Sequence, residues 1–164
     1  GTSHTAVKGA LQRARAARDR ARAGQAPRPG SATEYDLARR FADAYVAADL
    51  PRIVALLTDD AWLSMPPAPH EYHGIDAITA FLRASFHYRG DRPVHLLPAH
   101  ANGQPAFGSY LLDPAEPVAT PAGLFVLTMA GDRIQVITRF HLDALYPRFG
   151  LPDSLPEPVG PSTK

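Results

Sequence analysis

The stretch LLTDDAWLSMPPAPHEYHGIDAITAFL, residues 56–82, changes its apolar pattern twice within one short run. Its segment AWLSMPP, residues 61–67, predicts a strand that two prolines end, because proline cannot donate a hydrogen bond to a strand ladder. After Gly74 the apolar residues take helical spacing. These residues are Ile75, Ile78, Phe81, Leu82 and Phe86. The stretch therefore predicts a strand followed, after a proline-rich loop, by an amphipathic helix.

The segments on the two sides of residues 56–82 differ in the spacing of their apolar residues. Upstream, residues 33–57 carry two helical patterns, the first with Thr33 as expected N-cap and the second starting at Pro51. Downstream of Arg92 the apolar period becomes two, which is typical of strands. Four strands are expected there, with Asn102-Gly103 as a hairpin turn, followed by a short helix over residues 143–150. Helices followed by meandering strands predict an α+β fold, a curved antiparallel sheet over helices with a cavity on its concave side.

This order resembles the SnoaL-like fold, a cone-shaped relative of nuclear transport factor 2 and ketosteroid isomerase. The resemblance lies in residues 55–82, with ALLTDDA followed by an aromatic residue and then by G-x-x-A-I-x-x-F. A second run, ANGQPAFGSYL at residues 101–111, together with RFGLP near the end, is similar to the SnoaL-like extension of certain sigma factors. Those sigma factors are bacterial and belong to the extracytoplasmic-function group.

The amino-terminal segment differs from the rest in charge. Residues 1–30 hold seven basic side chains and one acidic side chain, so they carry +6 and the remainder of the 164-residue chain carries −5. Ser3 is a good N-cap, and apolar residues follow at helical spacing, which predicts a basic helix over residues 1–24. A linker is expected at residues 25–32, the globular domain at 33–150 and a proline-rich, extended tail at 151–164. On composition alone, the basic helix could equally be a solvated face.

The segment GTSHTAVKGALQRARA resembles the end of region 4 of the same group of sigma factors. The matching residues are Gly1, Ser3, Val7, Lys8, Leu11, Arg13 and Ala14. The resemblance implies the second helix of a helix-turn-helix, with His4, Thr5 and Lys8 reaching promoter bases and Arg13 among the phosphate contacts. The first helix of that motif is not in the sequence, so we expect a carboxy-terminal fragment of a sigma factor.

Large apolar and amide side chains are the candidates for lining a cavity, although each could instead be ordinary core or turn. They are Trp62, Met65, Tyr72, Asn102, Gln104, Phe107 and Tyr110. An apolar small molecule of modest size is the expected ligand.

Several classes of site are excluded or disfavoured. The chain has no cysteine, which excludes disulfides and thiolate metal sites. His70 and His73 are read as part of a surface turn, so no metal and no cofactor are expected. No apolar run reaches the ~18 residues of a membrane span, and a cytoplasmic location is expected.

An acid–base catalyst is also not expected. Asp59 and Asp60 are read as turn-capping residues, and Arg139 and His141 are placed on a rim or an outer surface. The resemblance implies a non-catalytic domain that regulates its own sigma factor in cis, with RNA polymerase core and promoter DNA as partners. The alternative is a stand-alone SnoaL-like enzyme of the cyclase, isomerase or hydrolase class or a ligand-binding protein. A third reading combines the two, with a metabolite in the cavity switching the sigma factor. A second copy of the chain, in a homodimer, is a further candidate partner.

Overall fold

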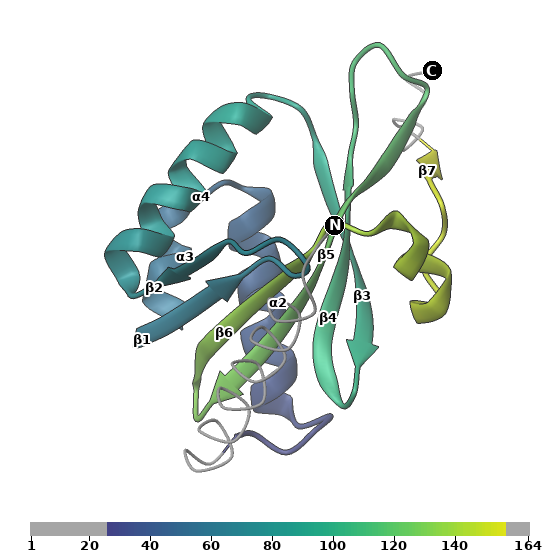
Figure 1. Ribbon diagram of the computed structural model, residues 1–164. Coiled ribbons are helices and arrows are strands. Elements are labelled where there is room, and N and C mark those ends of the chain that lie inside the picture. Colours follow the sequence, from purple (N-terminus) through teal and green to yellow (C-terminus); the bar gives the residue numbers. More distant parts are fainter. Residues whose placement is uncertain (1–25, 157–164) are drawn as a thin grey trace, which may run out of the picture.

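A computed structural model describes residues 26–156, in which three helices cover one side of a twisted sheet (Figure 1). The α-helices are α2 (Ala32–Val46), α3 (Leu50–Leu56) and α4 (Ile75–Arg89). The strands are β1 (Leu57–Ser64), β2 (Glu71–His73), β3 (Val94–Ala101), β4 (Gln104–Leu111), β5 (Val118–Ala130), β6 (Arg133–Phe140) and β7 (Leu155–Pro156). A 3-10 helix, η1 (Asp143–Phe149), lies on the side of the sheet away from the helices.

Helix α2 begins two residues earlier than the sequence predicts. Its N-cap is Ser31, whose hydroxyl accepts a hydrogen bond from the Glu34 N–H at 3.3 Å. The buried Glu34 carboxylate in turn accepts from the Gly30 N–H at 3.0 Å. The prediction of Thr33 as the cap is wrong because Ser31 and Glu34 together satisfy two free amides, as in a capping box.

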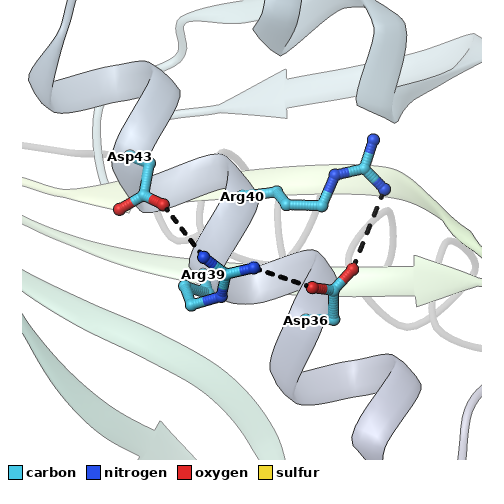
Figure 2. A network of polar contacts seen from close by, with 4 residues as sticks. All are labelled: Asp36, Arg39, Arg40 and Asp43. Atoms are coloured by element: carbon cyan, nitrogen blue, oxygen red, sulfur yellow. Dashed lines mark hydrogen bonds and ion pairs between the residues drawn. The ribbon is translucent and has the colours of Figure 1, made fainter.

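The outer face of α2 carries a short ladder of charges (Figure 2). Arg39 lies 3.0 Å from Asp36 and 3.5 Å from Asp43, and Arg40 lies 3.9 Å from Asp36. All four side chains are about half exposed. Exposed pairs of this kind contribute little to stability, so they keep this face soluble rather than hold the helix in place.

The sheet has the order β2-β1-β6-β5-β4-β3, with β7 pairing separately with β5. All its pairs are antiparallel except β1 with β6, which is parallel. The prediction of a wholly antiparallel sheet is wrong at this pair, because the long connection through α4 and three further strands returns the chain beside β1 in the same direction. The expected surface turn at His70–His73 is also wrong, since β2 pairs there with β1.

Both turns of the carboxy-terminal strands form where the sequence predicts them. Asn102 and Gly103 have φ of 52° and 74° and join β3 to β4. Positive φ at both central residues is the type I′ geometry that twists with the strands, and Asn-Gly tolerates it at low cost. Gly131, with φ of 59°, starts the turn between β5 and β6.

The strands β4 and β5 are buried on both faces. Phe107 and Phe125 point toward the helices and belong to the main core. Ala106 and Leu124, one position away on each strand, point to the other face and join a second core beneath η1. Alternation along a strand sends neighbouring residues to opposite faces, so this sheet is a layer between two hydrophobic cores.

Tyr146 of η1 holds the second core to the sheet. Its fully buried hydroxyl lies 2.7 Å from the carbonyls of Ser109 and Gly123 and accepts from the Gly123 N–H at 3.1 Å. These partners flank the irregular register between β4 and β5. Leu151, which the sequence assigns to an extended tail, is also buried in this core. The chain therefore stays ordered past the expected end of the domain.

Candidate functional site

The residues predicted to line a cavity do not gather around one. Phe107 is buried in the main core, 6.5 Å from the Phe41 ring of α2. Tyr110 lies on the opposite face of β4, in contact with Tyr146. The two cannot share a cavity, because they are three residues apart on one strand. The prediction that both face one ligand is therefore wrong for Tyr110.

The other candidates lie at the edge of the sheet or in a turn. Trp62 stacks on His73 at 4.3 Å, across the pair of β1 with β2. Tyr72 stacks on Phe81 of α4 at 4.4 Å. Met65 is half-buried against the main core. All of these side chains support the fold, and none lines the cavity described below.

The two amide candidates are also structural. Asn102 is exposed in the β3–β4 turn. The Gln104 side-chain amide donates to the Thr128 hydroxyl at 2.7 Å, across β4 and β5. The predicted DNA contacts, His4, Thr5, Lys8 and Arg13, lie outside the described residues.

An open cavity of about 180 Å³ lies between the carboxy-terminal ends of α2 and α4 and the sheet. Its lining comes from six elements or the loop just after one. The residues are Tyr45, Ser85, Tyr88, Arg89, Val94, Ser109, Leu111, Ala122, Arg139 and His141. Among these described residues there are two arginines and a histidine and no carboxylate. The site is therefore positively charged and apolar at the same time.

The two arginines lie at the ends of a row of aromatic rings. The Arg89 guanidinium carbon is 5.2 Å from the centre of the Phe86 ring, and that of Arg139 is 5.2 Å from the Phe125 ring. Tyr45 stands between these rings, 5.4 Å from Phe86 and 4.8 Å from Phe125. Stacking on a ring face orients a guanidinium and leaves its edges free to donate.

Backbone carbonyls fix both guanidinium groups. Arg89 donates to the carbonyls of Tyr45 and Val46 at 3.0 and 3.1 Å, at the end of α2 where helix carbonyls lack partners. Arg139 donates to the carbonyl of Ala122 at 2.9 Å. Gly123 lets Arg139 lie close to the strand, since a Cβ at that glycine would come within 2.9 Å of Arg139 Nε.

The ionisation of His141 reflects this setting. Burial lowers the pKa of His141, and the charge of Arg139 lowers it further, while Asp143 opposes the shift. The imidazole is thus neutral over a wider pH range than an ordinary histidine. On the other face of the sheet, burial raises the pKa of Tyr110 to about 12 and also raises that of Tyr146. Those hydroxyls remain protonated donors within the second core.

Sequence reasoning missed the cavity because it assigned the faces of β6 wrongly. It placed Arg139 and His141 on a rim or an outer surface because the alternate residues of this strand, such as Val136 and Phe140, are the apolar ones. In the structure η1 covers the Phe140 face, and Arg139 lies on the helix-covered face with His141 at its exposed edge. Arg89 carried no separate signal, since an arginine in the last turn of a helix is common.

Asp59 and Asp60 do not take part in the site. Both are exposed residues of β1, where the pairing with β6 shifts register between Leu57 and Trp62. The reading of this pair as helix-end caps is therefore wrong, because β1 begins before them. Within residues 26–156 no cluster of His, Asp and Glu could hold a metal ion. None of the helices described there has the length and hydropathy of a membrane span.

Three helices, a curved mixed sheet and an open cavity on the helix side define a cone-shaped α+β domain of the nuclear transport factor 2 and ketosteroid isomerase type. Comparison with known proteins agrees. Residues 38–137 match the SnoaL-like domain, and the chain belongs to this family. The fold prediction is thereby confirmed.

Two solved structures illustrate the shared fold. A putative ketosteroid isomerase from Kribbella flavida has a TM-score of 0.54 at 20% identity, covering 80% of this chain and 84% of its own. A SnoaL-like protein of unknown function from Burkholderia thailandensis has a TM-score of 0.53 at 18% identity, covering 66% of this chain and 94% of its own. At such identities the likeness concerns the fold alone.

One curated relative is closer in sequence. The chain is 39% identical over 158 residues to the ECF RNA polymerase sigma factor SigG of Mycobacterium tuberculosis, in two strains. The match covers 94% of this chain, which confirms the resemblance to sigma factors of this group. The chain spans 42% of the length of that relative.

Proposed function

We propose that this chain is the regulatory carboxy-terminal region of a bacterial sigma factor, with the SnoaL-like domain modulating transcription initiation in cis. The observation that carries this proposal is the extent of the match to SigG. Because the match covers 94% of the chain, it extends well beyond residues 38–137 on the amino-terminal side. The shared sequence therefore includes part of the basic segment as well as the SnoaL-like domain.

Charge supports contact between the two parts. Residues 1–30 carry +6 and the remainder carries −5. A short linker holds attached parts at roughly millimolar effective concentration, so weak attraction between them is sufficient. RNA polymerase core and promoter DNA are the proposed partners, with His4, Thr5, Lys8 and Arg13 as the DNA contacts. A cytoplasmic location follows from this role.

The proposed role is non-catalytic. Among the described residues no carboxylate lines the cavity, and Asp143, whose charge acts on His141, is outside the lining, whereas steroid isomerisation or polyketide cyclisation needs a positioned acid and base. Its volume of about 180 Å³ is below the roughly 300–1,000 Å³ of sites that enclose drug-sized ligands. Turnover of ketosteroid, polyketide or epoxide substrates by this domain would favour the enzyme reading instead.

Deletion in the full-length sigma factor tests the proposal. Removing residues 32–164 should change transcript yield from its promoter in a reconstituted assay with core polymerase. Removing only residues 157–164 is the matched control and should leave the yield unchanged. If both deletions give the transcript level of the intact factor, the domain does not act in cis.

Self-association is a separate expectation of the fold. A homodimer formed through the sheet would have to contact η1, because η1 covers the face of β4 and β5 that the helices leave open. Sedimentation of the intact chain measures this directly. A monomer at tens of micromolar would remove the dimer from the proposal without affecting regulation in cis.

A further inference from the structure

We propose that the cavity between α2, α4 and the sheet binds a small organic carboxylate with an apolar body about the size of one ring. The inference stands on the geometry of the cavity and is independent of the transcriptional role. It refines the expectation of an apolar ligand by adding a charged group.

The described lining of the cavity carries positive charge and no carboxylate. Arg89 and Arg139 both line it, and within residues 26–156 neither forms an ion pair with a carboxylate. Both side chains are only partly exposed. Charges held at a partly buried position are usually paired, so two arginines without a carboxylate partner favour binding of an anion in the cavity.

Hydrogen-bond donors are also left over. A guanidinium has five N–H donors, of which Arg89 uses two on α2 and Arg139 uses one on Ala122. The Nε atoms of both arginines are enclosed by the protein, so a ligand in the cavity would be bound through the terminal nitrogens of the guanidinium groups. Two terminal nitrogens of one guanidinium can hold a carboxylate with two parallel bonds.

The remaining walls select an organic acid over an inorganic anion. Tyr45, Val94, Leu111 and Ala122 give the cavity apolar sides. A cavity of about 150 Å³ lined by apolar groups holds benzene, so a volume of about 180 Å³ suits one ring and its carboxylate. Inorganic phosphate would satisfy the arginines and leave these walls uncovered.

Calorimetric or NMR titration of the full chain with benzoate tests the proposal. Benzamide is the matched ligand, because it has the same shape without the charge. Benzoate should bind in the millimolar range or tighter, and benzamide should bind at least tenfold more weakly. Equal binding of the two, or no detectable binding of benzoate at 10 mM, which is about ten times a millimolar Kd, overturns the proposal.

Variants then locate the site. Arg139→Gln and Arg89→Gln should each weaken benzoate binding at least tenfold. Arg83→Gln, an exposed residue of α4 outside the cavity, removes the same charge and should change binding less than twofold. Equal weakening by all three variants would show a diffuse charge effect and overturn the site. Tighter binding of inorganic phosphate than of benzoate would overturn the carboxylate specificity. If the two cavity variants do not fold, the comparison of benzoate with benzamide on the unaltered chain still decides.

Discussion

Tyr146→Phe tests whether one hydroxyl ties η1 to the irregular β4–β5 pair. The change keeps the ring, which contacts Tyr110 at 5.3 Å, and removes only the oxygen. That oxygen donates one hydrogen bond, to the carbonyl of Ser109 or Gly123, and accepts one from the Gly123 N–H. Each lost bond costs about 0.5–1.5 kcal/mol, and a buried group left unpaired costs about 1–3 kcal/mol. We expect a loss of roughly 2–4 kcal/mol in the free energy of unfolding.

Thermal and urea unfolding of the purified chain measure this loss. For a chain of this size, 1 kcal/mol corresponds to about 2–4 °C in Tm, so Tm should fall by roughly 5–15 °C. Tyr35→Phe is the matched control, because Tyr35 is 73% exposed, and it should change stability by less than about 0.5 kcal/mol. Equal Tm values for the two variants would refute the role assigned to the Tyr146 hydroxyl.

Four further predictions follow from the site and its surroundings. Gly123→Ala should lower stability by about 1–3 kcal/mol in urea unfolding, because φ is +131° there and the new Cβ would meet Arg139 Nε. The raised pKa of Tyr110, about 12, means that stability is full below pH 10 and falls as pH rises toward 12; Tyr110→Phe should flatten this fall in thermal melts. Because the pKa of His141 is lowered in the folded chain, the neutral imidazole favours the folded state fully above pH 6.5, the ordinary histidine pKa, and this stability is lost as pH falls further. Bound benzoate should raise the pKa of His141 in NMR titrations. Arg39→Gln on the exposed face of α2 should move Tm by less than about 2 °C.

The order and type of the main elements could be predicted from the sequence, because each depends on local periodicity. The turn at Asn102-Gly103 is the clearest example, since its two residues select type I′ geometry by themselves. The strand β2 could not be found this way, because its three residues follow a run of prolines and have too little length for a pattern.

The cavity could not be predicted, for two physical reasons. Arg89 and Arg139 come from elements that are brought together only by the sheet, so no spacing in the sequence relates them. The second reason is the covering of both faces of β6. Phe140 packs beneath η1. Unless the position of η1 is known, the alternation of side chains along β6 makes the Phe140 face look like the helix-covered one and the Arg139 face look exposed.

The place of β6 in the sheet sets an order on folding. Trp62 of β1 pairs with Val136 of β6, which follows it by roughly seventy residues, so joining the two strands closes a long loop at a high entropic cost. β6 lies between β1 and β5, although it is the last long strand to leave the ribosome. Until it arrives, the β1–β2 hairpin and the β3–β5 meander share no ladder. A chain halted before residue 133 therefore lacks the strand that joins these two parts into one sheet, and only the helices connect them.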